Sequence, residues 1–407
     1  MIIAQENGRT IPKADKVFAI NGRAKAMIAE KGKEAVANAT IGALMDDNGD
    51  LIVMESVMDA IRMLKPADFA EYAPISGTPA FKEAVKKALF GSHQTDRFVE
   101  VCASPGGTGS LRNTISNYSR PGDKVMTSDW FWAGYTTIVG ELGRSIATYE
   151  LFTEEGTFNI DSFAKTAESI VDEQGRLVIL LNTPAHNPTG YSLTDDDWDK
   201  VVAALNEISK KGPIALLVDA AYIDFAGDEE EYRSFFKKIE LLEENVLPLV
   251  AYSASKTLTL YGMRTGALVC MAPTAEIAEE FRRCAEFSSR GSWSNCVRAG
   301  QTVLANIYAS EELVAKVAKE REFFRNMLIA RGKAFEAALH EEGVQNVPFD
   351  AGFFTCVEHE DPAAISAALE EQGIFTVPLA KGVRISVASI SEEKCVKVAK
   401  AIAKLVK

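Results

Sequence analysis

The sequence predicts an α/β fold: a mostly parallel, doubly wound sheet flanked by helices, with a smaller α+β domain beside it. Short, continuous apolar runs such as residues 177–181 and 214–218 are typical of strands buried on both faces. Longer segments with helical spacing alternate with these runs, which favours parallel strands joined by crossover helices. Residues of distinctive chemistry follow the runs, at the edge where parallel strands bring their carboxyl ends together.

The length of the chain predicts two domains. At 407 residues it exceeds the size at which a single core usually divides. We expect residues 49–300 to form a large domain that holds the sheet. Residues 1–48 are expected to form the N-terminal part of the small domain, and residues 301–407 the linking helix and the rest of that domain.

The composition argues against several classes of protein. The apolar fraction of 47% is that of a globular protein, and the net charge of −13 disfavours nucleic acid or an anionic membrane as a partner. The six cysteines include no C-x-x-C pair, so neither a metal site nor a redox pair is predicted. Sparse cysteines suit a reducing compartment, and no signal peptide or membrane span is recognisable. We therefore predict a cytoplasmic protein.

The first part of the chain has the pattern of helices separated by turns. Helices are predicted over 16–35 and 52–64, with a turn cluster at 46–50, and a loop over 71–81 leads into a helix that ends near Gly91. Tyr72 lies in this loop, and on its own it is best interpreted as a packing residue.

A glycine-rich loop that contains Gly107 and Thr108 follows a strand predicted over 99–104, and a helix is predicted over 110–119. Backbone N–H groups at the start of a helix bind phosphate, and glycine lets the anion approach closely. A tight turn explains such a loop equally well, so the loop by itself leaves both interpretations open.

Three further strands end in residues suited to a ligand. The strands over 124–128, 177–181 and 214–218 are followed by Trp132, by Asn187, and by Asp219 with Tyr222, and helices are predicted between them over 161–173 and 195–210. Trp132 fits either the core or a place flat against a planar ligand. The Asn187 amide is held in a turn before a proline. Asp219 alone could equally be a helix N-cap.

Lys256 follows an apolar strand that starts near residue 247. A lysine drawn toward apolar surroundings loses solvation, so its pKa falls, and the neutral amine can form an imine with an aldehyde. The commoner alternative is a lysine that reaches the surface past the strand end. The polar residues that follow the other strand ends favour the chemical interpretation, because all of them belong to one edge of the sheet.

The last part of the chain is predicted to hold the interdomain helix and the small domain. A helical region is predicted over 297–342, strands near 349–355 and 382–387, and a final helix over 391–407. Acidic residues in the first turn of the final helix and lysines near its end suit the helix dipole.

These residues together fit one cofactor, pyridoxal phosphate. Lys256 would bind its aldehyde as an imine, Asp219 would pair with the protonated ring nitrogen, and Trp132 would cover the ring face. The other expected contacts are with the ring hydroxyl, from Asn187 and Tyr222, and with the phosphate, from Gly107, Thr108, Ser253 and Arg264.

The motifs S-A-S-K-T-L-T-L-Y-G-M-R-T-G, A-H-N-P-T-G, V-D-A-A-Y and G-G-T-G-S-L occur in an order that resembles the fold type I pyridoxal-phosphate aminotransferases, most closely the aspartate and aromatic branch of class I. The resemblance implies a seven-stranded-type sheet and transamination between an amino acid and a 2-oxo acid such as 2-oxoglutarate. It implies Lys256, Asp219 and Tyr222 as catalytic residues.

The resemblance extends to both ends of the chain and implies a homodimer with shared active sites. Gly42, with Trp132 and Asn187, is expected to contact the substrate, and Arg384 to bind its α-carboxylate. Tyr72 is expected to reach the phosphate in the partner subunit, and Arg290 to cross the interface to a side-chain carboxylate.

Three departures from the family pattern, at Tyr135, Asn182 and Trp130, affect the expected surroundings of Asp219 and leave rate and substrate preference open. Aspartate and aromatic donors both remain candidates, and the Asn187–Pro188 bond is a candidate cis peptide. A C–S lyase on the same fold is the nearest alternative function. A cofactor-binding regulator would need a basic DNA-binding segment, and a nucleotide-binding enzyme would need a lysine after the glycine loop; the sequence has neither.

Overall fold

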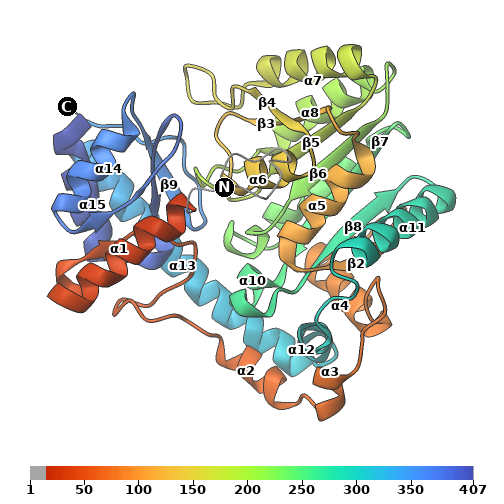
Figure 1. Cartoon of the computed structure of the whole chain (residues 1–407), viewed down its shortest axis with the longest axis horizontal. Helices are drawn as coiled ribbons and strands as arrows, with labels where there is room; N and C mark the ends of the chain where they lie inside the picture. Colours follow the sequence, from red (N-terminus) through yellow and green to blue (C-terminus); the bar gives the residue numbers. More distant parts are fainter. Residues whose placement is uncertain (1–14, 407) are drawn as a thin grey trace, which may run out of the picture.

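The computed structural model describes residues 15–406, and its centre is a seven-stranded sheet of order β2-β8-β7-β6-β5-β3-β4 (Figure 1). The strands are β2 Phe98–Ser104, β3 Lys124–Ser128, β4 Ser145–Tyr149, β5 Leu177–Asn182, β6 Ile214–Asp219, β7 Val246–Ser253 and β8 Gly266–Ala272. β8 alone runs against its neighbours, β2 and β7. The mostly parallel sheet is confirmed, and the carboxyl ends of the other six strands lie at one edge.

Side chains alternate along each strand, so the two faces of the sheet bury separate cores. Leu217 and Leu249 face one core with helices α5 (Gly106–Tyr118), α6 (Gly134–Glu141) and α11 (Ala275–Ser292). Leu216 and Val250 face the other with helices α4 (Pro79–Phe90), α7 (Ile160–Gln174), α8 (Asp195–Ile208), α9 (Phe235–Ile239) and α12 (Arg298–Tyr308). Both faces are covered, which is why the central strands are continuously apolar.

A smaller α+β unit lies to one side of the sheet (Figure 1). Its strands are β9 Phe354–Glu358, β11 Val377–Pro378 and β12 Gly382–Ser386 in an antiparallel sheet, and β1 Ala37–Asn38 paired with β10 Ile374–Phe375. Its helices are α1 Lys16–Lys31, α14 Pro362–Glu371 and α15 Glu392–Val406. The domain boundaries stay predictions, and residues 1–14 and 407 of the expected ranges lie outside the described residues.

Helix α13 (Glu311–Glu341) connects the two units. Its first half adds Leu313 and Val317 to the large core, and its second half adds Phe335 and Leu339 to the core of the small unit. Helices α2 (Glu55–Arg62) and α3 (Pro66–Ala70) pack beneath α12 and α13. Within residues 15–406, no helix combines the length and apolarity needed to cross a bilayer.

Three predicted boundaries are corrected. The helical region over 297–342 is broken before Ser310, whose hydroxyl accepts a hydrogen bond from the Leu313 N–H and caps α13. The helix predicted to start at residue 110 starts at Gly106, so the glycines form its first turn. The strand predicted from residue 349 begins at Phe354, because Gly352 has a φ of +96° that breaks extended backbone.

Several elements were not predicted from the sequence. The longer ones among them are β4, α6, α11 and α14. Residues 145–149 of β4 are half exposed at the edge of the sheet, so their pattern lacks the continuous apolar run of β5 and β6. An edge strand buries only part of its surface, which weakens the signal in the sequence.

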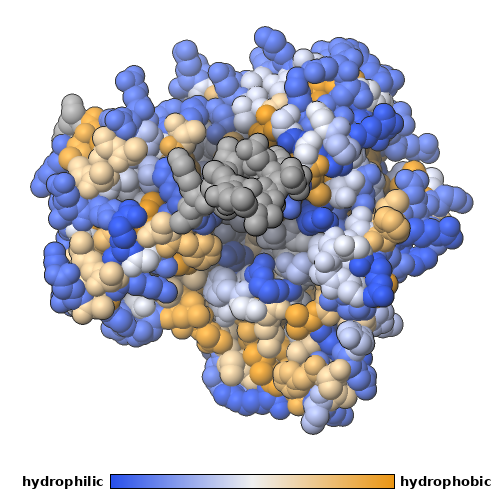
Figure 2. All heavy atoms as spheres, in the orientation of Figure 1, coloured by the Kyte–Doolittle hydropathy of each residue, from blue (hydrophilic) through white to orange (hydrophobic). Residues whose placement is uncertain are grey.

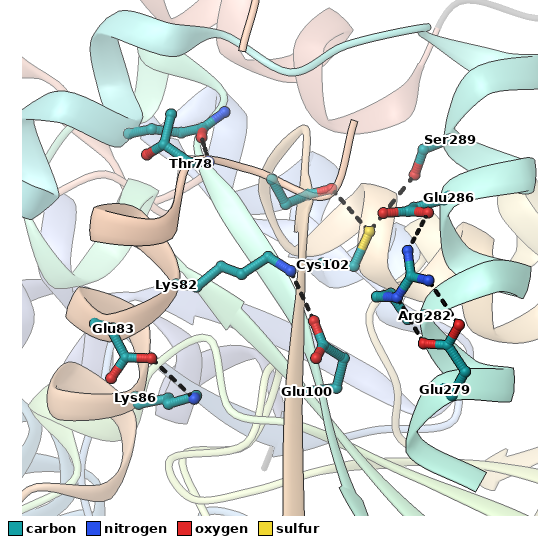
Figure 3. Close-up of polar contacts among 12 residues, drawn as sticks. Thr78, Lys82, Glu83, Lys86, Glu100, Cys102, Glu279, Arg282, Glu286 and Ser289 are labelled. Atoms are coloured by element: carbon teal, nitrogen blue, oxygen red, sulfur yellow. Dashed lines mark hydrogen bonds and ion pairs between the residues drawn. The ribbon is translucent and has the colours of Figure 1, made fainter. Parts of the chain in front are cut away.

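β2 is the opposite edge strand, and charged side chains flank it (Figure 3). Lys82 of α4 reaches Glu100 on β2, with 2.7 Å between Nζ and Oε1. On the other side Arg282 of α11 pairs with Glu279 and Glu286 of its own helix, each at 2.7 Å. A lysine over an edge discourages another strand from pairing with the exposed backbone.

Candidate active site

Lys256 lies at the carboxyl edge of the sheet, on the short helix α10 (Ala254–Thr257) that follows β7 directly. The side chain is partly buried, and its Nζ donates a hydrogen bond to the Gly42 carbonyl oxygen at 2.9 Å. Burial, with the positive charges of Arg264 and Arg384, lowers the pKa of Lys256 to about 7, against an opposing effect of Asp219. Near neutral pH a large fraction of this amine is therefore uncharged and nucleophilic.

This shifted pKa predicts how the apo-protein reacts with an aldehyde. Only the neutral amine is nucleophilic, so capture of pyridoxal at Lys256 should speed up as pH rises through about 7, rather than through the usual 10.5. Absorbance of the lysine–aldehyde product, followed across this pH range, measures the midpoint. Lys256→Ala should remove the low-pH phase and leave only slow reaction of surface lysines. A wild-type midpoint at the surface-lysine value would contradict the shifted pKa.

Asp219 is the last residue of β6 and is buried. Its Oδ2 accepts a hydrogen bond from the Tyr135 hydroxyl at 2.8 Å, and its backbone carbonyl accepts one from the Asn182 amide at 2.6 Å. Burial raises the pKa of the Asp219 carboxyl, and the Tyr135 hydroxyl opposes that rise. Two of the departures noted from the sequence thus contact Asp219, and the third, Trp130, is buried in the large core.

Arg384 reaches the same edge from β12 of the small unit and is buried. Its Nη1 donates to the Asn187 side-chain oxygen at 3.2 Å and its Nη2 to the Thr40 carbonyl at 2.8 Å, while the guanidinium lies 4.3 Å from the centre of the Phe354 ring. Its Nε has no hydrogen-bond partner among the described residues. A buried guanidinium with a free N–H is suited to a carboxylate ligand.

The first turn of α5 lies beside Arg264, an arrangement suited to an anion. The first N–H groups of a helix have no intrahelical partners, and Pro105 at the N-cap offers them no side-chain acceptor. Arg264 Nη1 donates to the Ser255 hydroxyl at 3.2 Å, and a Cβ on Gly106 would lie 2.7 Å from Arg264 Nη2. A Cβ on Gly107 would lie 3.6 Å from the Ser253 side chain, which is ordinary contact. Thr108 is exposed beside them.

Aromatic rings surround the amine. Tyr261, Tyr222 and Phe353 have ring centres 4.7, 5.6 and 5.9 Å from the Lys256 Nζ. The partly buried Trp132 ring packs edge-on against Tyr135, with 5.7 Å between centroids. Burial raises the pKa of the Tyr222 hydroxyl, so it remains protonated and able to donate a hydrogen bond.

Among the partners that sequence reasoning missed in this site, three make hydrogen bonds. These are Ser255, which contacts Arg264, Tyr261, whose hydroxyl accepts the Leu44 N–H at 3.0 Å, and the Thr40 carbonyl. Ser255 and Tyr261 stand in the motif around Lys256, so their position in sequence was a usable signal. The Thr40 carbonyl carried no signal, since any residue supplies one.

Two predicted residues lie apart from this group in the single chain. The Tyr72 side chain is 87% exposed, and the exposed Arg290 donates to the Ser294 hydroxyl on the same surface. Among the described residues, no contact joins either of them to Lys256 or Arg384. The possibility of a cis Asn187–Pro188 bond is wrong: the cis peptide of the described chain is Thr183–Pro184.

The residues present fit pyridoxal phosphate. A buried carboxyl at Asp219, a neutral amine at Lys256 and an uncapped helix start beside Arg264 match a ring nitrogen, an aldehyde and a phosphate. Arg384, a buried guanidinium at the same edge, is the group suited to a second, carboxylate-bearing molecule.

Comparison with known proteins bears on this arrangement. Residues 35–402 match the family model of aminotransferase class I and II. The aromatic-amino-acid aminotransferase of Paracoccus denitrificans is 28% identical over 326 residues, covering 79% of this chain and 80% of the relative. The aspartate aminotransferase of Salmonella typhi is 27% identical over 312 residues, covering 75% of this chain and 77% of the relative.

Solved structures agree over the whole chain. An aminotransferase from Anaerococcus prevotii superposes with a TM-score of 0.97 at 37% identity, covering 100% of both chains. An aromatic-amino-acid aminotransferase from Burkholderia pseudomallei, covalently bound to pyridoxal phosphate, has a TM-score of 0.83 at 24% identity, again with 100% of both chains covered.

Proposed function

The chain belongs to the class I and II aminotransferases, and from that premise we propose that it moves the α-amino group of aspartate or an aromatic amino acid to a 2-oxo acid such as 2-oxoglutarate. Pyridoxal phosphate is the proposed cofactor. The observation that carries the proposal is the Lys256 amine at the carboxyl edge of the sheet, whose pKa is lowered to about 7 by burial and by the charges of Arg264 and Arg384, against the effect of Asp219. An enzyme that must both bind an aldehyde and move a proton needs such an amine.

The cofactor supplies, when bound, an electron-withdrawing ring that acidifies the Cα–H bond of the amino acid. Lys256 would act as general base and then general acid: its amine would take the Cα proton of the amino acid and deliver it to the former aldehyde carbon of the cofactor. The Asp219 carboxylate would accept a hydrogen bond from the protonated ring nitrogen and favour its positive charge, and the Tyr135 hydroxyl donates a hydrogen bond that stabilises this carboxylate. Arg384 grips the α-carboxylate, which orients the Cα–H bond toward the amine.

The remaining roles concern binding. Gly107, Thr108, Ser253, Ser255 and Arg264 are proposed to hold the phosphate, Asn187 and Tyr222 the ring hydroxyl, Trp132 the ring face, and Gly42 the substrate. The contact between Arg384 and the Asn187 oxygen supports a shared place for ring and substrate. The contact between Arg264 and Ser255 supports a phosphate site at the first turn of α5.

The decisive test is a screen of amino donors with 2-oxoglutarate as acceptor. Aspartate, tyrosine, phenylalanine and a cysteine conjugate are offered in parallel, and glutamate formation is followed. Glutamate produced from aspartate or an aromatic donor supports the proposal. Pyruvate and ammonia released from the cysteine conjugate without any 2-oxo acid would instead identify a C–S lyase.

A homodimer with shared active sites accounts for the exposure of Tyr72 and Arg290. Figure 2 shows apolar residues gathered over α2, α3 and α12, and Met63 and Phe69 there are 54% and 66% exposed. An exposed apolar surface of this kind is typical of a protein–protein interface. A fully active monomer in sedimentation velocity would rule the dimer out.

A cytoplasmic location and a domain division near residues 48 and 300 complete the proposal. The six cysteines are all free, which suits a reducing compartment. One curated aspartate aminotransferase, from Dictyostelium discoideum, is described as cytoplasmic, and it is 28% identical to this chain.

Arg290→Leu is expected to discriminate between substrates. If Arg290 pairs with a side-chain carboxylate across the interface, kcat/KM for aspartate should fall about 10- to 100-fold, because a charge-assisted hydrogen bond is lost, while phenylalanine should be little affected. Steady-state kinetics with both donors measure this. Arg283→Leu, which removes another exposed arginine of α11, is the matched control. Equal losses for the two donors would remove the role assigned to Arg290.

A further inference from the structure

Behind Lys256 lies a buried ionic cluster of two arginines and one aspartate, made up of Asp224, Arg233 and Arg321. Asp224 Oδ1 lies 2.7 Å from Arg233 Nη2 and 3.5 Å from Arg321 Nη1. The side chain of each is at most 10% exposed. Although burial works against ionisation, the charges of Arg321 and Arg233 hold the pKa of Asp224 below its usual value. The carboxylate is therefore ionised across the neutral pH range.

The cluster converges on Thr257, the residue next to Lys256. The Thr257 hydroxyl donates to Asp224 Oδ2 at 2.6 Å, and the Thr257 carbonyl accepts from Arg321 Nε at 3.0 Å. The hydroxyl and the carbonyl of one buried residue are thus held by the same cluster. Arg233 supports it from the other side, because its guanidinium donates to the carbonyls of Ala88 and Leu89 at the end of α4.

Helix α10 needs such support. It has four residues, Ala254–Thr257, and one turn of helix has no stability of its own in water. Its first residue is fixed through the Ala254 N–H, which donates to the Thr265 carbonyl at 3.1 Å. Its last residue is fixed by the cluster. The backbone is therefore fixed both before and after Lys256. The residue after it, Thr257, is held by the charged groups of Asp224 and Arg321.

The cluster also connects Lys256 to the helix that carries the small unit. Arg321 and Arg331 stand ten residues apart on α13, about 15 Å along the helix axis. Arg331 Nη1 donates to the Met45 carbonyl at 3.0 Å, and its Nη2 pairs with Asp47 at 2.7 Å. One helix thus binds the backbone beside Lys256 with one arginine and the segment that follows Gly42 with another.

Stability alone is a poor explanation for this arrangement. A buried ion pair gives up solvation that its Coulomb attraction barely recovers, and apolar residues of similar volume often stabilise as well or better. Arg321 Nη2 even lacks a hydrogen-bond partner among the described residues. What apolar residues cannot do is hold a hydroxyl and a carbonyl in fixed directions.

We propose that Asp224 and Arg321 are positioning residues that act through Thr257 to hold the Lys256 amine where it meets both cofactor and substrate. The inference rests on the proposed function and deepens it, since it concerns how the Lys256 amine is oriented for proton transfer. Neither residue touches the reacting atoms. An amine displaced by a fraction of an ångström keeps its chemistry but loses its alignment, and misplacement of this kind lowers rate more than binding.

The test uses the holoenzyme and Thr257→Val, which keeps the shape of the side chain and removes its hydroxyl. We expect kcat to fall about tenfold, with KM for the amino acid within about twofold, because alignment rather than binding is lost. The pH midpoint at which the visible absorbance band of the lysine–cofactor linkage titrates should differ from that of the wild-type holoenzyme. Thr257→Ser, which keeps the hydroxyl, should restore both values.

Thr376→Val is the matched control, since it deletes another buried hydroxyl, one that contacts Ser366 in the small unit at 3.1 Å. It should lower the thermal unfolding midpoint of the apo-protein without changing kcat or the absorbance titration. Arg321→Lys keeps a charge near Asp224 but loses the Nε donor to Thr257. It should reproduce the fall in kcat, and it carries the test if Thr257→Val fails to fold.

Two outcomes would overturn the inference alone, and a third would overturn it together with the proposed function. Wild-type kcat and an unshifted titration in folded Thr257→Val and Arg321→Lys would show that the cluster only stabilises the fold. Equal losses of kcat in Thr257→Val and Thr376→Val would show the same. A wild-type protein that neither transaminates nor shows the visible band would overturn the proposed function, and this inference with it.

Discussion

Lys256→Ala is expected to abolish transamination, with a loss of kcat on the order of 10⁶-fold, the size seen when the central nucleophile of an enzyme is removed. The same amine is proposed both to bind the aldehyde and to move the Cα proton, so its removal ends two functions together. The measurement is glutamate formation from 2-oxoglutarate and an amino donor. Borohydride reduction of the wild-type holoenzyme, followed by peptide mapping, should place the cofactor adduct on Lys256 alone.

Two variants control this experiment. Lys256→Arg keeps a positive charge but cannot lose its proton, so it should be as inactive as the alanine variant. Lys82→Ala removes a lysine that pairs with Glu100 at the β2 edge and should retain wild-type turnover (Figure 3). An adduct on another lysine, or wild-type turnover by Lys256→Ala, would defeat the assignment of the amine.

Asp219→Asn is expected to lower kcat by about 10³-fold, because a neutral amide cannot stabilise a protonated ring nitrogen and an electrostatic contact of this kind contributes about that much to catalysis. The amide has nearly the same shape, so the Tyr135 hydroxyl still has an oxygen to donate to. Burial raises the pKa of Asp219, which means that its ionised form destabilises the empty site near neutral pH. The apo-variant should therefore unfold at the wild-type temperature or above it.

Asp350→Asn serves as the matched control. Asp350 is another carboxyl with a raised pKa; the residue is exposed, and it accepts the Ser192 N–H at 2.7 Å away from Lys256. Its amide variant should keep kcat close to the wild-type value. If both variants lost activity equally, or if Asp219→Asn kept wild-type kcat, the ring-nitrogen role of Asp219 would be excluded.

The sheet and its carboxyl edge were predictable because burial on both faces leaves a continuous apolar run in β5, β6 and β7. Where such a run stops, the next polar residue must lie at the strand end. That reasoning placed Asp219 and Lys256 correctly at this edge. It failed for β4, which is half exposed, and for the break before Ser310, where a single N-cap residue divides two helices.

The individual hydrogen bonds between distant segments were not predictable. Arg384 meets Asn187 across 197 residues of chain, and Lys256 donates to the carbonyl of Gly42, a group that every residue possesses. The ionic cluster behind Lys256 joins residues 224, 233 and 321, none of which stands in a motif. No sequence pattern predicts which of these residues meet, because the packing of helices and loops determines it.

The sequence by itself determined the family, the order of the central strands along the chain and the residues that end them, because local periodicity and motif order are properties of the chain. Only the tertiary structure decided the chemistry of the site: a lysine pKa near 7, a carboxyl steadied by Tyr135, and Tyr72 and Arg290 left on the surface. The physical reason is that solvation and charge depend on which distant groups share an enclosed space, and packing alone brings those groups together.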